Sequence, residues 1–563
     1  MNDPDKTASP SAKWLGPLAI GAGFAVVKLL LHFAFNSNYG YFRDELYFLA
    51  CGEHLAWGYP DHAPLVALVA KTSRLLLGDS LFAIRFFPAV AGALKVFLTA
   101  LLVREFGGKT FAALLACLCV LGAPVYLAID NLLSMNPLEP VFWTLCVYFA
   151  VRAVKETPSV DETAEIRNPK SEIRNPSLNW LFFGLFAGLG LMNKHSMVFF
   201  GFALVAGLLA TKARKAFLDK YFWMGGALAF VIFLPNVVWQ FQHDFATLEL
   251  LQNVQKTGKN VVLSPWQFVV SQIMALLPVT LPVWLAGLWY FLGDRRGRRF
   301  RFLGVAYLVL LALMIFLKAK DYYLVPVYPM LLAGGAVFFE DLFEKARRLR
   351  FVKYVLPVPI AVLAALVAPV VVPVLPVETL IKYQEAIGFK PPKSEVAHDS
   401  PLQQIFGDQF GWPEMVAKVA DVYDALPPDE RAKAGIYASN YGEAGAIDFF
   451  GPRYGLPKAI SPHQSYFLWG SRDYTGEILI VLGASKEDAE KKLRIGRRKN
   501  RGRASLFRQL RKIPHPRLPP DEKAARGNLA GLKALELRRF RIADFGFRIG
   551  SGRKVSAFFR LQH

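Results

Sequence analysis

The residues best suited to chemistry lie in a polar stretch directly after the first apolar run of the chain. Arg43, Asp44 and Glu45 open this stretch, and Asp61 and His62 follow a short distance later. Ionisable side chains beside an apolar helix at a membrane surface mark a functional site by default. Because Asp44 and Glu45 are adjacent, they point to different sides and need different roles. A carboxylate placed here is suited to deprotonating an attacking hydroxyl or amine, unless Asp44 merely pairs with Arg43 to anchor the loop.

A second carboxylate, Glu139, lies in the segment Asp130–Pro140. Pro137 can open a helix there, which would put Glu139 in the first helical turn. Such a carboxylate either caps the helix through the helix dipole, or it acts on a substrate or a divalent metal. We take Glu139 as a candidate substrate-binding residue. No cofactor is certain from the sequence, which leaves a divalent metal open, and the metal ligands are unknown.

Two cationic turns complete the candidate site. Lys320, Tyr322 and Tyr323 lie in one turn, and Lys194 lies in a shorter one. Lysines can hold a phosphate anion as point charges, and tyrosines can stack on a sugar. The alternative is an aromatic belt at the membrane surface, with lysine side chains extending towards water. With Asp61 and His62, these residues form the predicted substrate-binding set.

Composition indicates a protein that crosses a membrane many times. Hydrophobic residues make up 54% of the 563 residues, and the mean hydropathy is +0.30. Runs of about 17 to 23 apolar residues recur along the chain, each long enough to span a bilayer as a helix. We expect about eleven spans, beginning near residues 15, 84, 110, 137, 178, 196, 221, 267, 302, 323 and 354.

The positions of Lys and Arg in the short loops predict the orientation, because cytoplasmic loops carry an excess of these residues. The loops that alternate onto one side contain Lys6, Lys13, Arg104, Lys109, Arg152, Lys155, Lys212, Arg214, Lys215, Arg295, Arg296, Arg298, Arg299, Lys345, Arg347 and Arg348. We therefore expect a protein of the inner cell membrane whose N-terminus lies in the cytoplasm. The candidate residues and everything after about residue 376 then face outward.

The net charge of +22 does not indicate a nucleic-acid partner. From residue 491 onward the chain has 22 Lys and Arg against 4 Asp and Glu, so the basicity belongs mainly to the tail. The four cysteines form neither a disulfide framework nor a metal-ligand spacing.

Two segments have unusual sequences. Glu165–Pro169 recurs as Glu172–Pro176, which predicts a low-complexity insertion at about residues 156–177. One possible coding of that repeat, read on the opposite strand, gives the sequence found at Arg541–Phe545. We therefore interpret residues 491–563 as an atypical tail that replaces the original C-terminus. Sequencing the gene tests this, because a lack of inverted complementarity would exclude it.

Residues 376–490 predict a small extracytoplasmic α/β domain. Gly435–Ala438 and Ile478–Gly483 have the composition of buried strands, and Pro413–Leu426 and Glu443–Phe450 are expected to be helices. The fold class is thus mainly α, with a transmembrane helix bundle at residues 1–375 followed by this domain.

These motifs resemble the family 39 type of GT-C glycosyltransferases over roughly residues 15–350. The resemblance rests on Asp44–Glu45, Asp61–Leu65, Ser134–Glu139, Gly188–Lys194 and Lys320–Pro329. The family includes protein O-mannosyltransferases and the bacterial transferases that add aminoarabinose to lipid A. It implies a GT-C-like bundle, a polyprenyl-phosphate-linked sugar donor, and inverting transfer of a hexose or pentose at the outer face. The acceptor would be a lipid, a glycan or a protein of the cell envelope.

The resemblance also implies roles for individual residues. Asp44 becomes the catalytic base, Glu45 its neighbour in acceptor binding or site organisation, and Glu139 a loose counterpart of a second acidic position. His62 stands where relatives that bind lipid A have a lysine, which weakens the lipid A assignment.

Two other classes of protein remain open. A transporter or lipid flippase would share the many spans, but it usually places ionisable residues at the bilayer midplane and in paired repeats, whereas the acids singled out here lie in loops. A membrane scaffold without catalysis would leave Asp44 and Glu45 replaceable. The sequence has no Gly-rich phosphate loop, which agrees with a lipid-linked rather than a nucleotide-linked donor.

Overall fold

The computed structural model describes most of the chain up to residue 482. The described residues are 10–156, 177–257, 261–391, 400–474, 477–482 and 556–558. The predicted insertion at about 156–177 and most of the basic tail fall outside them. The chain forms two compact units, one of Met1–Phe48 and Gly52–Asp408 and the other of Leu49–Cys51 and Gln409–His563.

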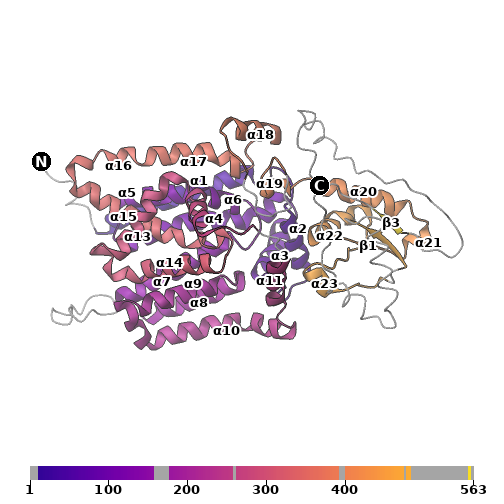
Figure 1. The fold of residues 1–563 in the computed structure, drawn as a ribbon, viewed down its shortest axis with the longest axis horizontal. Helices are drawn as coiled ribbons and strands as arrows, with labels where there is room; N and C mark the ends of the chain where they lie inside the picture. The colour runs from indigo at the N-terminus through magenta and orange to yellow at the C-terminus, as the bar shows by residue number, and fades with distance from the viewer. Residues whose placement is uncertain are drawn as a thin grey trace. The chain divides into compact units, whose positions relative to one another are not determined.

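The first unit is a bundle of helices that run side by side (Figure 1). Its α-helices are α1 (Pro10–Phe35), α2 (Arg43–Glu53), α3 (Leu65–Leu77), α4 (Leu81–Glu105), α5 (Thr110–Gly122), α6 (Pro124–Ile129), α7 (Leu138–Glu156), α8 (Ser177–Asn193), α9 (Met197–Leu209), α10 (Lys220–Gln242), α11 (Ala246–Thr257), α12 (Pro265–Ala275), α13 (Leu281–Leu292), α14 (Arg301–Phe316), α15 (Tyr328–Lys345), α16 (Val352–Val355), α17 (Pro357–Val371), α18 (Val377–Ala386) and α19 (Gln404–Gly407). Short 3-10 helices join them at η3 (Lys212–Leu218), η4 (Pro278–Thr280), η5 (Arg296–Phe300), η6 (Asp321–Tyr323), η7 (Val325–Val327) and η8 (Arg347–Leu349).

Many of these helices are apolar on most sides, as expected for helices surrounded by lipid and by one another. Helix α1 packs on α4, α8 on α7 and α10, α9 on α14, and α13 on α15. The mainly α membrane fold predicted from the sequence is confirmed. Among the described residues, six helices are long and apolar enough to span a membrane, or eight if each of two bent pairs is one span. The total of eleven spans stays a prediction.

One predicted span is sharply broken. The apolar run that begins near residue 267 forms α12 and α13. The helical segments Pro265–Ala275 and Pro278–Leu292 meet there at a bend of 93°. The break lies at Leu277, which has a positive φ of 73°, and at Pro278, which cannot donate a backbone hydrogen bond to continue the helix. Composition predicted the apolar run but not this bend.

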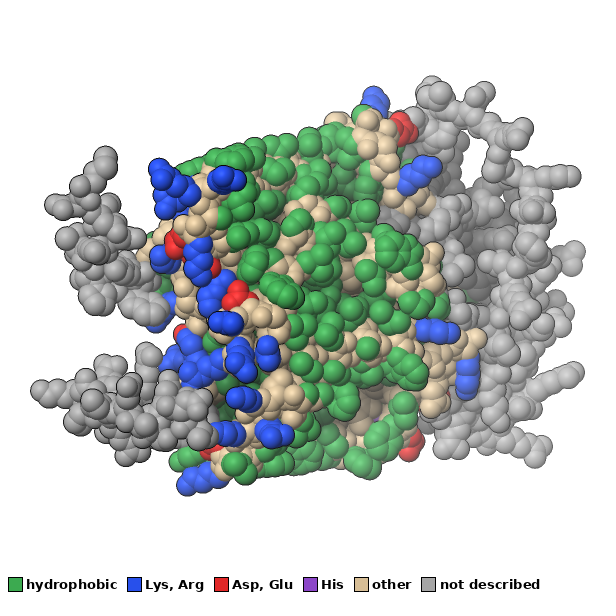
Figure 2. Space-filling view, turned by 60° about the vertical axis from the view of Figure 1, so that its left-hand side comes forward, with side chains coloured by type: hydrophobic (Ala, Val, Ile, Leu, Met, Phe, Trp, Pro, Cys, Tyr) green, Lys and Arg blue, Asp and Glu red, His purple; other side chains and the backbone are tan. Residues whose placement is uncertain are grey.

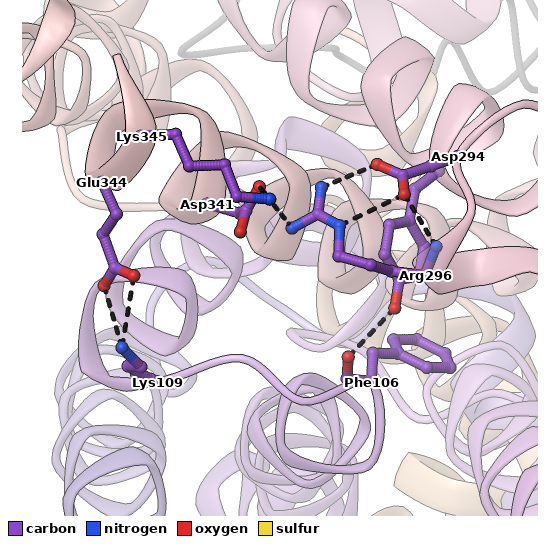
Figure 3. Close-up of polar contacts among 8 residues, drawn as sticks. Phe106, Lys109, Asp294, Arg296, Asp341, Glu344 and Lys345 are labelled. Atoms are coloured by element: carbon purple, nitrogen blue, oxygen red, sulfur yellow. Dashed lines mark hydrogen bonds and ion pairs between the residues drawn. The ribbon is translucent and has the colours of Figure 1, made fainter. Parts of the chain in front are cut away.

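Lys and Arg side chains gather at one end of the apolar surface (Figure 2). Ion pairs at helix ends join several of the loops predicted to be cytoplasmic. Lys109 contacts Glu344 at 3.2 Å, and Arg296 contacts Asp294 at 2.6 Å and Asp341 at 2.8 Å (Figure 3). The loops after α4 and α13 and the end of α15 therefore meet at one end of the bundle, as the alternation of charged loops requires.

The second unit is a small α/β layer. Its parallel sheet has the order β1 (Ala434–Tyr437), β2 (Ile478–Val481) and β3 (Ser556–Phe558), with Ala434 opposite Ile478 and Leu479 opposite Ser556. Its helices are α20 (Trp412–Asp424), α21 (Pro428–Arg431), α22 (Tyr441–Phe450), η9 (Gly451–Tyr454) and α23 (Ser465–Trp469). The strands β1 and β2 and the helices α20 and α22 lie at the positions expected from their sequence patterns. The tail strand β3 was not expected.

This second unit begins later in the chain than the predicted domain boundary at residue 376. Helix α18 belongs to the first unit, where Leu380 packs with Leu402, Phe406 and the Tyr39 ring. The residues that follow α17, up to Asp408, therefore belong to the first unit, because apolar contacts join them to the bundle.

Candidate active site

Helix α2 positions the first two candidate carboxylates. Asp44 and Glu45 both lie in its first turn, where the helix dipole stabilises negative charge. The Asp44 side chain is 35% exposed, and its Oδ1 lies 3.4 Å from the Arg43 Nε. Arg43 in turn contacts Asp408 at 3.3 Å. Asp44 is therefore a partly exposed carboxylate beside the guanidinium group of Arg43.

Glu45 differs from Asp44 in being completely buried. Arg85 binds it in two places, with Nε 2.9 Å from Oε1 and Nη2 2.8 Å from Oε2. The backbone N–H groups of Phe42 and Leu133 also donate to this carboxylate, at 2.8 and 2.9 Å. Arg85 donates its other protons to the carbonyls of Asn36 and Gly40, each at 2.7 Å. These contacts suit Glu45 to site organisation rather than to proton transfer. Because Arg85 donates to Glu45 and to backbone carbonyls, it is a poorer candidate than the lysines for binding a phosphate.

The next candidate pair lies in the loop between α2 and α3. The Tyr47 hydroxyl donates to Asp61 at 2.8 Å. The His62 ring is buried, stacks on Tyr59 at 4.4 Å, and donates from Nδ1 to the Ala63 carbonyl at 2.8 Å. Nε2 is thereby left as the unprotonated nitrogen of the neutral ring, and it has no hydrogen-bond partner among the described residues.

Burial controls the protonation of this pair. It raises the pKa of the Asp61 carboxyl, and the neighbouring Asp44 carboxylate adds to that rise, although His62 and the Tyr47 hydroxyl oppose it. Burial also lowers the pKa of His62, with Asp61 and Asp44 opposing the change. His62 is therefore a neutral hydrogen-bonding group at pH 7 and adds no positive charge for a phosphate.

Glu139 and Lys194 form the second half of the site. Glu139 lies in the first turn of α7, as expected, and its Oε2 is 2.7 Å from the Lys194 Nζ. The Ser196 hydroxyl donates to the other carboxylate oxygen. Lys194 also donates to the Asn136 Oδ1 at 3.0 Å. The carboxylate thus orients the ammonium group.

The tyrosine turn covers this ion pair. The Lys194 Nζ lies 4.5 Å from the Tyr323 ring and 5.1 Å from the Tyr322 ring. The Lys320 Nζ lies 5.9 Å from the Tyr322 ring. Tyr322 is within electrostatic range of both Asp44 and Glu139. The structure therefore brings the predicted residues of separate loops into one neighbourhood.

A narrow pocket opens beside these residues. Its polar wall consists of Asn136, Glu139 and Tyr322, and its apolar wall of Val125, Ile129, Pro140, Val325 and Pro326. A pocket with a cation behind its polar wall and an apolar opposite wall suits a ligand that is polar at one end and hydrocarbon at the other.

Sequence reasoning missed several residues of this region. The missed residues bind site residues that lie elsewhere in the sequence: Ser196 binds Glu139, Asn136 binds Lys194 and Tyr47 binds Asp61. Asn136 lies in one of the motifs, and Ser196 directly follows the Lys194 turn. Lys28 and Lys95 were also overlooked. Their signal was visible, because a lysine inside an apolar span is itself unusual.

Metal ions in proteins are held by clusters of His, Cys, Asp or Glu side chains. In the ranges that the structure describes, no group of three or more His, Cys, Asp or Glu side chains is placed to hold a metal ion. Asp44 and Asp61 lie within electrostatic range of each other. The neighbouring His62 donates from Nδ1 to the Ala63 carbonyl, so this nitrogen is not available as a metal ligand.

Comparisons with known proteins give matches of family and fold. The family model described as dolichyl-phosphate-mannose-protein mannosyltransferase matches residues 61–161 and 171–239. The solved structure of ArnT from Cupriavidus metallidurans bound to undecaprenyl phosphate is similar, with 14% identity, coverage of 78% of this chain and 85% of that chain, and a TM-score of 0.52. Its apo state matches with 13% identity, coverage of 83% and 86%, and a TM-score of 0.50.

The oligosaccharyltransferase of Archaeoglobus fulgidus in its apo form matches with 13% identity, coverage of 77% of this chain and 63% of that chain, and a TM-score of 0.46. A search of curated proteins finds no match.

The similarity of the helix bundle to the ArnT structures shows a multi-pass membrane protein with the GT-C fold. The family match, which includes the Asp61–Leu65 motif and Glu139, confirms the resemblance to glycosyltransferases of the family 39 type. Family and fold together support a membrane glycosyltransferase.

Proposed function

We propose that the chain moves a sugar from a polyprenyl-phosphate-linked donor to a lipid, glycan or protein acceptor at the outer face of the membrane. The observation that supports the proposal is that a partly exposed carboxylate, Asp44, lies within electrostatic range of Tyr322 in the wall of a pocket. Two other residues of that wall, Glu139 and Asn136, bind the Lys194 Nζ. The ArnT structure with a similar fold contains undecaprenyl phosphate, a ligand with a phosphate at one end and hydrocarbon at the other. This pocket has walls suited to both ends.

Asp44 is the general base in the proposed reaction. It takes the proton of the acceptor hydroxyl or amine while that atom attacks the anomeric carbon of the sugar. The bond between the anomeric carbon and the phosphate oxygen breaks, and polyprenyl phosphate leaves with the bonding electrons. Attack opposite the leaving group inverts the anomeric centre.

Lys194 and Lys320 stabilise the leaving phosphate. Negative charge on the phosphate grows as the bond breaks, and fixed cations in a partly dry pocket act strongly on it. Glu139 and Asn136 hold the Lys194 Nζ in place, at 2.7 and 3.0 Å. Tyr322 and Tyr323 provide faces for the sugar ring.

The test measures transfer of radiolabelled sugar from a panel of polyprenyl-phosphate sugars, in membranes with matched amounts of each variant. Asp44→Asn is expected to lower transfer by about 100-fold or more, because it removes the proton acceptor. The control is Asp79→Asn, which changes another exposed carboxylate of the bundle and should leave transfer unchanged. Equal transfer by wild type and Asp44→Asn would remove Asp44 from the mechanism.

One observation favours a transporter as a second candidate. Lys28, Lys95 and Asp130 form a fully buried ionisable cluster within the bundle, and transporters often place such groups inside the membrane. Uptake or flipping of a labelled polyprenyl-phosphate sugar by proteoliposomes, without any transfer to an acceptor, would support this candidate instead.

A further inference from the structure

A cluster of three charged side chains lies inside the helix bundle, apart from the site residues described above. Asp130 follows α6 and accepts from Lys95 of α4 at 2.8 and 2.9 Å. It also pairs with Lys28 of α1 at 3.1 Å. All three side chains have no exposed surface. Burying ions is costly and contributes little to net stability when they are paired, so such a cluster calls for another explanation.

Both lysines of this cluster have second partners that favour the ammonium form. The Lys28 Nζ donates to the Tyr126 carbonyl at 3.1 Å. The Lys95 Nζ lies 4.2 Å from the centre of the Tyr126 ring, whose face attracts cations. Two amino groups thus share one carboxylate, and with both of them protonated the cluster carries one positive charge more than Asp130 balances.

The short helix α6, with the residue that follows it, contacts both this cluster and the pocket. Val125 and Ile129 of that helix line the pocket, whereas Tyr126 and Asp130, the next residue after each, contact the lysines. The Tyr126 hydroxyl also donates at 2.8 Å to the carbonyl of Val325, another residue of the pocket wall. The cluster and the pocket therefore contact adjacent residues of the same short segment, and we take their separation as about 10 Å, the diameter of one helix with its side chains.

We propose that the Lys28–Asp130–Lys95 cluster is a second, internal source of positive potential that strengthens binding of the lipid phosphate in the pocket. This inference rests on the proposed function. A fixed charge in a dry interior acts over about 10 Å because little solvent screens it. The cluster acts through space, without touching the ligand, so its lysines are positioning residues for the phosphate.

Two substitutions remove the excess charge while leaving a neutral pair behind. Lys28→Met leaves Lys95 with Asp130, and Lys95→Met leaves Lys28 with Asp130. Each variant is purified, reconstituted in nanodiscs, and titrated with a polyprenyl monophosphate and with the uncharged polyprenol of the same chain length. If one variant fails to fold, the other still tests the proposal.

Each variant is expected to bind the polyprenyl phosphate about tenfold more weakly than wild type, the size expected for one unit charge at about 10 Å in an effective dielectric of about 20. Polyprenol binding should not change. The tenfold difference should persist at high salt, because buried charges are poorly screened.

Three outcomes would overturn the inference. Unchanged phosphate affinity in both variants would show that the cluster has no electrostatic effect on the pocket. An equal loss of phosphate and polyprenol binding would indicate a structural role. Competition by millimolar inorganic phosphate in the wild type would indicate a site for free phosphate instead. Failure of the wild type to bind polyprenyl phosphate would overturn the proposed function together with this inference. Binding by the wild type with unchanged affinity in both variants would overturn this inference alone.

Discussion

Asp44 and Glu45 are adjacent carboxylates with opposite environments. Glu45 has no exposed surface and binds Arg85 through both oxygens, whereas the Asp44 side chain is 35% exposed. Consecutive positions in the first turn of α2 therefore hold an anchored carboxylate and an accessible one. Glu45 also contacts the segment leading to Glu139, because its Oε1 accepts from the Leu133 N–H at 2.9 Å.

Substituting Glu45 should affect stability before it affects chemistry. Glu45→Gln removes the carboxylate charge that binds the buried Arg85 guanidinium through both oxygens, which is expected to cost about 3–5 kcal/mol. Thermal unfolding in detergent should show a clearly lowered midpoint. The matched variant Asp44→Asn should unfold at the wild-type temperature. A Glu45→Gln protein with wild-type stability and no transfer activity would instead assign Glu45 a direct catalytic role.

The candidate residues of the loops could be predicted because polar and aromatic side chains stand out between apolar runs. Their individual partners could not be predicted. That Glu45 pairs with Arg85, and Glu139 with Lys194, follows from how α2, α4, α7 and α8 are placed in three dimensions. The buried cluster around Asp130 depends even more on this placement, because its three members come from distant parts of the chain.

At the scale of elements, close helix contacts hold the bundle together. Helices α13 and α15 meet at Gly287 and Gly335, where a β-carbon would collide with the carbonyl oxygens of Leu331 and Val283. Small residues allow such approach between helices in a membrane. The ion pairs of Arg296 with Asp294 and Asp341 lie at the ends of the same two helices (Figure 3).

A larger side chain at this crossing should force the helices apart. Gly335→Leu is expected to destabilise the protein by roughly 3 kcal/mol or more, because the atom it meets belongs to the backbone and has no free space to move into. Gly226→Leu in α10 is the matched control, since nothing lies within 4 Å of a β-carbon there. Fluorescence-detected gel filtration of both variants measures the folded fraction. Equal folded fractions would contradict the described α13–α15 packing.

The existence of the helices was predictable from apolar runs, but their interruptions were less so. The break at Leu277 and the short helix α6 depend on packing as well as on Pro278 and Pro124. In the second unit, the strands β1 and β2 could be expected from their apolar composition. Their parallel pairing with β3 from the tail could not, because strand order is a property of the folded unit.

At the scale of the whole molecule, the charge distribution predicts the orientation in the membrane. The basic end of the bundle (Figure 2) should face the cytoplasm, and the candidate site should face outward. This orientation is required by the proposed function, because donor phosphate and acceptor must meet at the outer surface.

Single new cysteines test the orientation. The four native cysteines are buried and should not react. An impermeant maleimide applied to intact spheroplasts is expected to label Asp244→Cys, near the proposed outer site, and to label Lys212→Cys of η3 only after permeabilisation. Both native positions are exposed. The reverse labelling pattern would place the site on the cytoplasmic side and contradict the account.

The most direct test of the central claim follows both halves of the donor at once. A polyprenyl-phosphate sugar labelled with tritium in the sugar and with radioactive phosphorus in the phosphate is given to proteoliposomes containing the wild-type protein and an acceptor extract. The account predicts that one polyprenyl phosphate is released for each sugar transferred, and that both products are lost in Asp44→Asn. Phosphorus arriving on the acceptor with the sugar, or equal transfer by both proteins, would contradict it.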